Sequence, residues 1–505
     1  MRISLLVEMA GDALGDRPIV GAKVGGMSAA KLLTRARRAA CWASRKNVER
    51  IGLIGANSDA VPVALLASSL SGHPFVPLNF RLADDRLQAI LSRIAPAVVV
   101  VDQGVADRVG SIDGVELVER DEFLAALDDP ALDETCEEPT EDIAVLLFTS
   151  GTTGEPKGAV LRHANLCSYV LGTVEFLGAD EDEATLVSVP PYHIAGLMVI
   201  LTSIYAGRRL YYLPSFDPDR WVDTVRDEGI TQAMVVPTML GRILDALERR
   251  GEKLPTLRAI SYGGGRMPVP VIERALQMLP EVNFVNAYGL TETSSTVAVL
   301  TPDDHREVIA SGDPSVRRRL GSVGRPIHTL ELEIRDLNDQ VVGPGVVGEI
   351  WVRGDQVSGE YLDRDDKAEG GWFRTRDSGW LDEGGYLFVE GRLDDVIVRG
   401  AENMSPGEIE EVLMEHPAVD EAAVVGVPDQ EWGEHVAAAV VLVPGQEVSA
   451  DELRGWVRKR LRSSRTPHEI EFRDELPYNE TGKLLRRVLR DELTAMTDQG
   501  GTGPG

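Results

Sequence analysis

The sequence predicts an α/β protein with a parallel sheet in its larger N-terminal part and a small α+β domain at its C-terminal end. Short apolar strands alternate with helices over roughly the first 100 residues, which is the pattern of a parallel sheet. A chain of 505 residues exceeds one compact core, so at least two domains are expected. From Gly348 onward the pattern becomes β-rich before helices return.

Composition narrows the class of protein. The formal net charge is −29 and the isoelectric point is near 4.7, so nucleic acids and anionic membranes are not expected partners. No apolar stretch reaches the about 20 residues of a membrane-spanning helix. Acidic residues follow the N-terminus too soon for a signal peptide. Cys41, Cys136 and Cys167 form no CxxC pair, which favours a reducing cytoplasm over a disulfide or zinc framework.

The first third of the chain contains the clearest strand and helix signals. The predicted elements are strands at 50–56, 74–78 and 97–101 and a helix at 82–94. Gly72 is expected to end the helix that follows the first strand, because glycine commonly terminates helices. The acidic stretch 121–140 is predicted to be a solvated loop.

A buried strand is predicted at 143–148, and it leads into small residues that suit an anion. The sequence from Leu147 is LFTSGTTGEPKG. Glycine N–H groups and hydroxyl groups can surround a phosphate, and Lys157 adds a cation. It is not a Walker loop, because Lys157 lies between Pro156 and Gly158. By itself the stretch could also be a flexible surface loop. The expected phosphate-binding residues are Thr149, Ser150, Gly151, Thr152, Thr153, Gly154 and Lys157.

Three further motifs follow in order. His193 ends a Pro-Pro-Tyr-His turn, although a lone histidine among apolar residues is more often a packed core residue. The glycines 263–265 follow a predicted strand, where they form either a tight turn or an uncovered floor for a ligand. In Tyr-Gly-Leu-Thr-Glu, Tyr288 can stack on adenine, Thr291 can bind a phosphate, and Glu292 is a hard oxygen ligand for Mg²⁺.

These motifs, in this order, resemble those of the adenylate-forming superfamily, which includes acyl-CoA synthetases, luciferases and the adenylation domains of peptide synthetases. The resemblance covers about residues 20–492. It implies a large N-terminal domain of parallel-sheet αβαβα subdomains with a small β-barrel, and a smaller mobile C-terminal α+β domain. The implied divisions are an N-terminal domain at 1–392, a hinge at 393–395, a C-terminal domain at 396–495 and a disordered tail at 496–505.

The resemblance also implies a role for each site residue. His193 shapes the acyl pocket and shields the reacting carboxylate; it is not a general base, because that nucleophile is already ionised. Thr291 and Glu292 act on the α-phosphate and Mg²⁺, and Lys483 lies between the carboxylate and the α-phosphate. Further ATP-binding residues are Gly264, Gly265, Asn286, Ala287, Tyr288, Gly289, Asp377 and Arg392. The acyl pocket adds Ala195, Gly196, Val236, Thr238 and Gly263; the hinge pivot is Asp394; and the CoA-binding residues are Arg399, Gly400, Ala401 and Trp432.

Two positions depart from the family pattern. Arg376 stands where the family usually has glycine, between Thr375 and Asp377, and could alter nucleotide affinity or form a local salt bridge. Ala401 stands where a second glycine is common, and its methyl group narrows the pantetheine channel. Trp432 could stack on the CoA adenine or pack on the domain surface.

The C-terminal part contains two predicted capping boxes. Ser405 to Glu408 is expected to open a helix through His416, and Ser449 to Glu452 is expected to open a second one. Strands are predicted at 421–427 and 435–443.

The expected function is that of an acyl-CoA synthetase, an acid–thiol ligase that uses ATP, Mg²⁺ and coenzyme A. A carboxylic acid, fatty or aromatic, becomes an acyl-adenylate with release of pyrophosphate, and the acyl group then passes to the CoA thiol with release of AMP. Two alternatives stay open: a stand-alone ligase that loads the phosphopantetheine of a carrier protein, and a non-catalytic nucleotide-binding relative. A cytoplasmic monomer or homodimer is expected.

Overall fold

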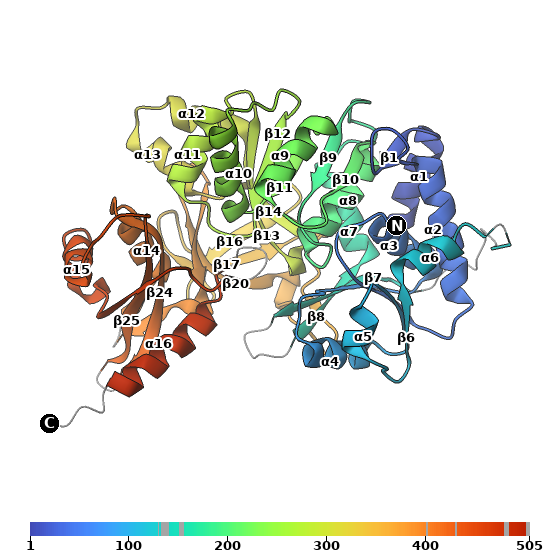
Figure 1. Cartoon of the computed structure of the whole chain (residues 1–505). Coiled ribbons are helices and arrows are strands. Elements are labelled where there is room, and N and C mark those ends of the chain that lie inside the picture. The colour runs from blue at the N-terminus through green and yellow to red at the C-terminus, as the bar shows by residue number, and fades with distance from the viewer. Residues whose placement is uncertain are drawn as a thin grey trace. The chain divides into compact units, whose positions relative to one another are not determined.

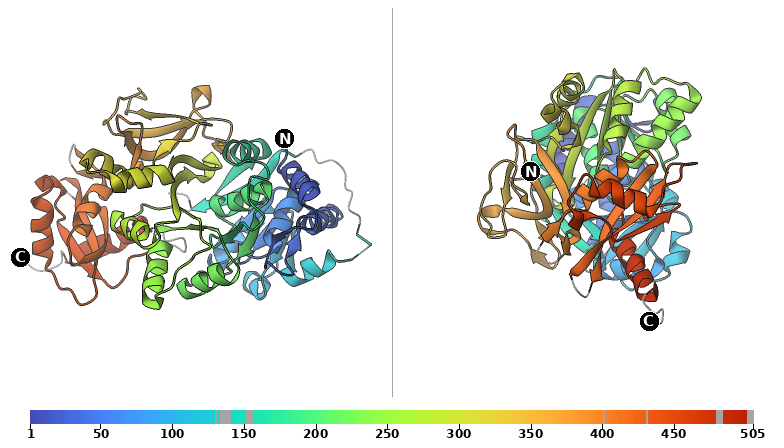
Figure 2. Two further views of the ribbon diagram at one scale, coloured as in Figure 1. Left: turned by 90° about the horizontal axis from the view of Figure 1, so that it is seen from above. Right: turned by 90° about the vertical axis from the view of Figure 1, so that its left-hand side faces the viewer.

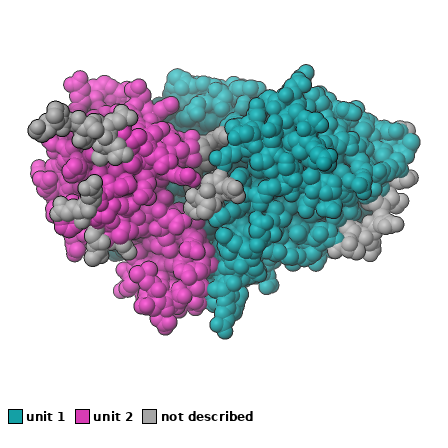
Figure 3. Space-filling model, turned by 90° about the horizontal axis from the view of Figure 1, so that it is seen from below, with its two compact units in different colours: residues 1–332, 352–373 teal, residues 333–351, 374–505 magenta. Residues whose placement is uncertain are grey.

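The computed structural model describes residues 1–129, 131–132, 141–150, 156–399, 402–429, 432–478 and 484–500. The chain divides into two compact units, which Figure 3 shows in different colours. Unit 1 consists of residues 1–332 and 352–373, and unit 2 consists of residues 333–351 and 374–505. Each unit has its own hydrophobic cores.

Unit 1 contains a nine-stranded sheet in the order β15-β14-β13-β12-β11-β9-β10-β1-β2 (Figure 1). Its strands are β1 (Pro18–Val20), β2 (Met27–Ser28), β9 (Ala184–Val187), β10 (Arg209–Tyr212), β11 (Gln232–Val235), β12 (Ala259–Gly263), β13 (Asn283–Leu290), β14 (Ser295–Leu300) and β15 (Arg325–Pro326). The neighbours from β1 through β13 run parallel, and β14 runs antiparallel to β13.

A second, eight-stranded sheet of unit 1 has the order β19-β18-β8-β7-β4-β3-β5-β6. Its strands are β3 (Arg50–Ile54), β4 (Phe75–Leu78), β5 (Ala97–Val101), β6 (Val115–Glu119), β7 (Ile143–Ser150), β8 (Pro156–Arg162), β18 (Glu360–Tyr361) and β19 (Arg364–Asp365). The neighbours from β6 to β7 are parallel, and β8 returns antiparallel to β7.

The cores show that helices and these two sheets form five alternating layers, which Figure 2 shows from two further directions. The middle core joins both sheets to α1 (Ile3–Leu14), α2 (Ala29–Ser44), α3 (Ala60–Ser71), α7 (His163–Thr173) and α8 (Ile194–Ala206). The nine-stranded sheet packs its other face on α9 (Pro218–Asp227), α10 (Pro237–Arg250) and α11 (Val269–Met278). The eight-stranded sheet packs its other face on α4 (Asp84–Ile94) and α5 (Val105–Val109). This αβαβα arrangement confirms the predicted fold class.

Side chains of alternate strand residues reach opposite cores, as the pleat of a strand requires. In β5, Val98 and Val100 belong to the middle core, whereas Val99 and Val101 face α4 and α5. The remaining short elements of unit 1 are α6 (Arg120–Ala126), α12 (Pro302–Ala310), α13 (Pro314–Arg317), η1 (Thr291–Thr293), η2 (Arg318–Gly321) and η3 (Glu369–Gly371).

The predicted strands and the helix of the first third are confirmed. Gly72 ends α3 with a left-handed φ of 74°, a conformation that glycine adopts without strain. The predicted loop at 121–140 is wrong in its first part, where α6 forms. Phe123 is fully buried there and meets the Trp42 ring edge-on at 5.3 Å, and Leu124 and the fully buried Leu127 pack on the same core. Residues 130 and 133–140 lie outside the described residues.

Unit 2 contains the segment that was predicted to form a small β-barrel. This segment carries a four-stranded sheet in the order β16-β17-β20-β21. Its strands are β16 (Glu331–Arg335), β17 (Gly348–Arg353), β20 (Phe373–Leu381) and β21 (Leu387–Arg392). A hairpin joins β20 to β21, with Gly385 at a φ of 77° in its turn, as the sequence predicts.

The rest of unit 2 is an α+β fold around a five-stranded sheet. Its strands are β22 (Ile397–Arg399), β23 (Glu402–Met404), β24 (Val419–Asp429), β25 (Gly433–Leu442) and β26 (Glu469–Arg473). Its helices are η4 (Leu393–Asp395), α14 (Pro406–Met414), α15 (Ala450–Arg458), η5 (Ser463–Arg465) and α16 (Arg486–Gly500). One sheet face packs on α14 and α15, and the other packs on Leu489 and Leu493 of α16. Every helix in the described part of the chain is too short or too polar to cross a membrane.

The two predicted capping boxes have different outcomes. The Ser449 side chain accepts a hydrogen bond from the Glu452 amide at 3.2 Å, so Ser449 is confirmed as the N-cap of α15. The Ser405 cap is wrong, although α14 begins where predicted. The Ser405 hydroxyl donates instead to the Glu390 carbonyl at 3.1 Å, and Glu408 pairs with Arg465 at 2.5 Å.

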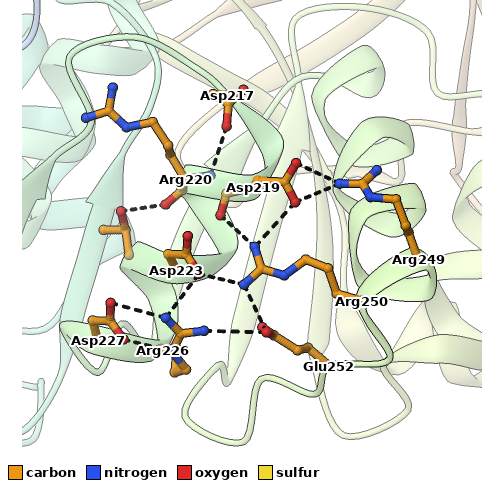
Figure 4. A network of polar contacts seen from close by, with 10 residues as sticks. Asp217, Asp219, Arg220, Asp223, Arg226, Asp227, Arg249, Arg250 and Glu252 are labelled. Atoms are coloured by element: carbon orange, nitrogen blue, oxygen red, sulfur yellow. Dashed lines mark hydrogen bonds and ion pairs between the residues drawn. The ribbon is translucent and has the colours of Figure 1, made fainter.

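Arginine–carboxylate pairs join α9 to α10 on the surface of unit 1 (Figure 4). Arg250 contacts Asp223 at 2.5 Å and Glu252 at 2.9 Å, and Arg249 contacts Asp219 at 2.6 Å. The hydrogen bond from Arg250 lowers the pKa of Asp223. Exposed pairs contribute little individually, but shared partners make this network a specific link between the helices.

Stability at mildly acid pH is predicted to depend on His163, which begins α7 and is 1% exposed. Burial, and then the nearby Arg2 guanidinium, lowers the pKa of His163 to about 4. The pKa of a histidine in an unfolded chain is about 6.5. At pH values between the folded and the unfolded pKa, the unfolded chain therefore binds a proton that the folded chain does not. The free energy of unfolding therefore falls as the pH falls through this window, by about 2 kcal/mol between pH 7 and pH 5.

The measurement is equilibrium urea unfolding at both pH values for the wild type and for His163→Asn. Other titrating groups are common to both proteins, so the variant should lose about 2 kcal/mol less than the wild type. An equal loss in both proteins would contradict the assignment.

Candidate functional site

The carboxyl ends of neighbouring parallel strands hold four of the predicted motifs. Strands β9, β11, β12 and β13 are adjacent and parallel, so the residues that follow them lie along one sheet edge. His193 follows β9, and Val236 and Thr238 follow β11. Gly263 ends β12 and residues 264–265 follow it, and residues 286–289 lie within β13. The structure therefore brings the predicted acyl and adenine residues to the same edge.

Glycine is suited to this edge for two different physical reasons, which are close backbone packing and an uncovered backbone. A Cβ atom on Gly263 would lie 2.3 Å from the carbonyl oxygen of Ala287, and one on Gly289 would lie 1.7 Å from that of Ser295. These two glycines permit the close approach of backbones. Gly264 and Gly265 are exposed, and Gly264 has a φ of 78°. An uncovered backbone of this kind is what a flat ligand requires.

His193 and its neighbours form the start of α8. The His193 ring lies 4.8 Å from the Tyr192 ring, and its backbone N–H donates to the Pro190 carbonyl at 3.2 Å. Gly196 is buried, and a Cβ atom there would meet the same carbonyl at 2.4 Å. Ala195 is half-buried beside it. The backbone contacts of this turn thus fix the point from which the His193 side chain projects.

The predicted adenine-binding residues on β13 differ in their surroundings: some are buried and hold neighbouring backbone, and others reach the surface. The Asn286 amide donates to the Ser322 carbonyl at 3.1 Å and is buried, so it holds the backbone of a neighbouring turn. Tyr288 is half-buried and Gly289 is exposed, and Ala287 pairs with Val299 of β14. Among these four residues, Tyr288 carries the aromatic ring.

The backbone carbonyl and the side-chain carboxylate of Glu292 are both held by residues that follow it in the chain by more than sixty positions. Its backbone carbonyl accepts hydrogen bonds from the amides of Ser358 at 2.8 Å and Gly359 at 3.3 Å. Its carboxylate accepts a hydrogen bond from the Tyr361 hydroxyl. Burial, and then the charge of Glu292, raises the pKa of Tyr361, so the phenol stays a donor. Tyr361 has no motif in the sequence that indicates this role, because the role depends on strand pairing.

Residues 356–362, here called the bridging segment, also bind the two sheets of unit 1. The fully buried Gln356 amide donates to the carbonyls of Thr293 at 3.0 Å and Thr296 at 2.9 Å, and it accepts from Thr329 at 2.8 Å. The Ser358 hydroxyl donates to the Val160 carbonyl on β8. The bridging segment thereby places the turn with Thr291 and Glu292 next to the strand that carries Lys157.

The predicted phosphate loop connects β7 to β8. Thr149 lies directly opposite Lys157 in the register of this hairpin. Residues 151–155, with Gly151, Thr152, Thr153 and Gly154, lie outside the described residues, as does the side chain of Ser150. Arg93 supports the hairpin, since it donates to the Pro156 carbonyl at 2.6 Å. Within the described ranges, no carboxylate lies within 4.0 Å of the Lys157 ammonium, which suits a group that binds an external anion.

In unit 2, the predicted ribose ligands Asp377 and Arg392 pair with each other. They are opposite residues of β20 and β21, and the Arg392 Nε atom lies 3.0 Å from Asp377 Oδ1. Arg392 also donates to the Thr375 carbonyl at 2.9 Å, and the Thr375 hydroxyl accepts from the Asp377 amide at 3.1 Å. This set of contacts fixes the orientation of the Asp377 carboxylate, which is 7% exposed.

Arg376 has a φ of 63°, in the left-handed region that favours glycine. This conformation explains why glycine is common at this position. The Arg376 side chain is exposed, and it forms no salt bridge with another described residue. The local salt bridge considered from the sequence is therefore not found in the part of the chain that the structure describes.

Several predicted residues of unit 2 lie outside the described residues, namely Gly400, Ala401 and Lys483. The ends of the Lys483 loop are defined, because Tyr478 pairs with Leu484 and the Leu485 amide donates to the Pro477 carbonyl at 2.7 Å. Asp394 is exposed in η4.

Arg399 and Trp432, the other two predicted CoA residues, lie together. The Arg399 guanidinium is 5.8 Å from the centre of the Trp432 ring, and Arg399 pairs with Gly433 on β25. Arg399 also donates to the Ser464 carbonyl at 2.9 Å. Trp432 is 48% exposed, so one face of the indole can accept a ring.

The Glu292 carboxylate fits a magnesium ion. One oxygen is held by Tyr361, and the second stays available to a cation. Mg²⁺ in phosphate sites binds through one or two carboxylates, with phosphate oxygens and waters completing its shell.

Comparisons with known proteins agree with this geometry. A family model described as AMP-binding enzyme matches residues 8–362, and one described as AMP-binding enzyme C-terminal domain matches residues 408–483. The chain is 32% identical to a 2-succinylbenzoate–CoA ligase of Bacillus cereus, over 89% of this chain and 90% of the relative. It is 34% identical to a fatty acid–[acyl-carrier-protein] ligase of Streptomyces coeruleorubidus, over 88% and 87%.

A solved structure is similar over nearly the whole chain. It is the o-succinylbenzoate coenzyme A synthetase of Bacillus subtilis in complex with ATP and a magnesium ion. The TM-score is 0.82 and the identity is 28%, with 96% of this chain and 99% of that chain covered.

Replacing Arg376 by glycine is predicted to stabilise unit 2. A left-handed backbone costs a residue with a Cβ atom about 1–2 kcal/mol, and glycine loses about 0.5–1 kcal/mol through its freer unfolded state. We therefore expect Arg376→Gly to raise the free energy of unfolding by about 0.5–1 kcal/mol in urea titrations. Arg376→Ala is the matched control, since it removes the charge and keeps the Cβ atom. An equal gain in both variants would assign the effect to charge instead of backbone strain.

Proposed function

The chain belongs to the AMP-binding enzyme family, and we propose that it is an acid–thiol ligase that makes acyl-CoA from a carboxylic acid, ATP and CoA. The observation that carries the proposal is the bridging segment, which holds a Mg²⁺-binding carboxylate, Glu292, beside the strand of the phosphate loop. The two relatives described above are ligases by name, and this chain covers nearly their full length. The alternative of a non-catalytic relative has no comparable support.

In the first half-reaction, the substrate carboxylate attacks the α-phosphate of ATP. The Thr291 hydroxyl donates to an α-phosphate oxygen, and Lys157 with the loop 150–154 binds the departing phosphates. Glu292 holds Mg²⁺, which offsets negative charge on the phosphates when it is bound. The Lys483 ammonium orients the two anions and offsets the charge of the in-line transition state. His193 shields the reacting carboxylate from water, and no base is needed because the nucleophile is already ionised.

Asp377 binds the ribose hydroxyl groups in this proposal. Arg392 keeps the carboxylate oriented, because the guanidinium contacts it directly. Tyr288 stacks on the adenine, and the uncovered backbone of Gly264 and Gly265 forms the floor beneath it.

In the second half-reaction, the CoA thiol attacks the acyl carbonyl and AMP leaves. We propose that the C-terminal part, residues 396–495, rotates about Asp394 in the hinge 393–395 relative to residues 1–392. This rotation withdraws Lys483 and presents the β22–β23 turn, with Gly400 and Ala401, to the pantetheine arm. Arg399 pairs with a CoA phosphate and Trp432 stacks on the CoA adenine, because the two side chains form one cationic and aromatic surface.

The acid is proposed to be aromatic or fatty. The residues assigned to the acyl pocket, His193, Ala195, Gly196, Val236, Thr238 and Gly263, are mostly small or apolar, and such walls accept flat or aliphatic groups. The two relatives described above are named for an aromatic acid, 2-succinylbenzoate, and for a fatty acid.

A carrier-protein ligase is the second candidate, and the relative from Streptomyces coeruleorubidus favours it by name. In that case the phosphopantetheine of a separate carrier protein replaces CoA. The cytoplasmic location and the monomeric or dimeric state stay predictions from the sequence.

The test is acid-dependent AMP release from ATP over a panel of short, medium, long and aromatic acids, with and without CoA. We expect turnover that requires CoA and that peaks on one acid class. Lys483→Ala is the matched variant: it should lose acyl-adenylate formation and keep thioester formation from supplied acyl-adenylate. Slow adenylate formation that CoA does not accelerate would select the carrier-protein ligase. Equal loss of both half-reactions in Lys483→Ala would contradict the two-conformation mechanism.

Tyr361→Phe is predicted to weaken magnesium use without unfolding the site. Loss of one hydrogen bond to a charged group costs about 1.5–3 kcal/mol, so the Mg²⁺ concentration at half-maximal activity should rise about 10-fold or more. Glu292→Gln should give a larger rise, because it removes the charge as well. The measurement is activity against Mg²⁺ at fixed ATP. An unchanged Mg²⁺ dependence in both variants would remove Glu292 from the metal site.

A further inference from the structure

A cluster of metal-ligand side chains in unit 2 contains none of the residues assigned to catalysis. His435 on β25, His468, and Glu469 on β26 each have a ligand atom within 4.8 Å of the others. The cluster belongs to the edge of the five-stranded sheet where these two strands run parallel. Two imidazoles and one carboxylate form the ligand set that zinc uses in sites with three protein ligands.

His435 is the buried member, and one of its ring nitrogens has no partner. The residue is 5% exposed, and among the described residues its Nε2 atom has no hydrogen bond. This atom faces Glu469, with 3.8 Å between Nε2 and Oε1. A buried polar atom without a partner is unfavourable by about 1–3 kcal/mol, so a ligand at this point would remove that penalty.

The other ring nitrogen of His435 faces a carboxylate that can set the tautomer. Asp429 Oδ2 lies 3.6 Å from Nδ1, and Asp429 Oδ1 accepts the Trp432 amide at 2.8 Å. A proton on Nδ1, directed at Asp429, leaves the lone pair of Nε2 pointing into the cluster. Metal-binding histidines commonly have a carboxylate partner of this kind on the second nitrogen.

The backbone positions of the cluster are fixed, and its outer side is open. The His468 amide donates to the Val436 carbonyl at 2.7 Å, and Glu469 lies opposite Ala437 in the register of β25 and β26. His468 is exposed and Glu469 is half-buried, so an ion can enter from solvent. Two ligand atoms that each lie about 2.0–2.1 Å from a tetrahedral zinc ion are about 3.4 Å apart. The ligand atoms here lie within 4.8 Å of one another, so rotation of the side chains would bring them to the distance that zinc requires.

We propose that His435, His468 and Glu469 form a binding site for a divalent transition-metal ion, with zinc as the probe that defines it. Asp429 is a positioning residue for His435. Because Asp429, His435 and Glu469 lie on β24, β25 and β26, the bound ion joins the ends of three strands of one sheet. The site is independent of Glu292 and of the Mg²⁺ proposed there.

The test is isothermal titration of the chelator-treated, full-length protein, without a histidine tag, with ZnCl₂ in a large excess of MgCl₂. We expect one zinc ion per chain. His468→Ala and Glu469→Gln should each weaken binding at least about 100-fold, and Asp429→Asn should weaken it about 10-fold. His328→Ala, at an exposed histidine of unit 1, is the control and should leave binding unchanged.

The exposed position of His468 keeps the proposal testable if a His435 variant fails to fold. Co²⁺ supplies a second readout, since a four-coordinate cobalt ion with imidazole ligands absorbs visible light more strongly than the hexaaquo ion. Zinc affinity that is the same in the wild type, His468→Ala and Glu469→Gln would overturn the proposal. Displacement of zinc by the excess Mg²⁺ would also overturn it, because Mg²⁺ does not compete at imidazole nitrogen.

Discussion

The bridging segment, residues 356–362, is the constraint on which the geometry of the site depends. One of its ends is fixed to the nine-stranded sheet by the buried Gln356 amide, and the other is fixed to the eight-stranded sheet by the pairing of β18 with β8. The two sheets also share a core of apolar side chains, which defines a distance but few directions. Hydrogen bonds have direction, so this segment sets how Glu292 is oriented relative to the β7–β8 hairpin. Each bond left unmade in that buried place would cost about 1–3 kcal/mol, which explains why a polar side chain is retained at full burial.

The two units hold groups of different kinds. Unit 1 presents glycine backbone, a hydroxyl group and one carboxylate at the end of parallel strands, where rigid elements fix their positions. Unit 2 presents the pair of Asp377 and Arg392 and the surface of Arg399 and Trp432, which are already preorganised by contacts within that unit. A ligase with two successive half-reactions needs both sets. Asp377 and Arg392 lie on one side of the proposed hinge 393–395, and Arg399 and Trp432 lie on the other, so rotation about that hinge leaves each pair intact.

The sequence predicted what depends on local pattern and missed what depends on tertiary pairing. The strand at 97–101 follows from five consecutive apolar residues, and the end of α3 follows from Gly72. The helix α6 was missed because acidic residues dominate this stretch, although Phe123, Leu124 and Leu127 have the spacing of a helix face and pack on the core. Ser405 was assigned a cap that its hydroxyl does not make, since the Glu390 carbonyl competes for it. Tyr361 and the cluster around His435 could not be found, because strand pairing brings their partners together from distant parts of the chain.

The network between α9 and α10 is built from arginine, and the same preference extends over the chain. Planar guanidinium groups bind two carboxylates at once, as Arg250 does, which a single ammonium group does less well. The sequence contains 44 arginines and 8 lysines, so arginine carries most of the cationic surface. Lys157 and Lys483 are therefore two of a very small number of primary amines. A reagent that acylates amines would modify few positions on this protein, and protection of a lysine by nucleotide could be assigned to one residue by peptide mapping with little background.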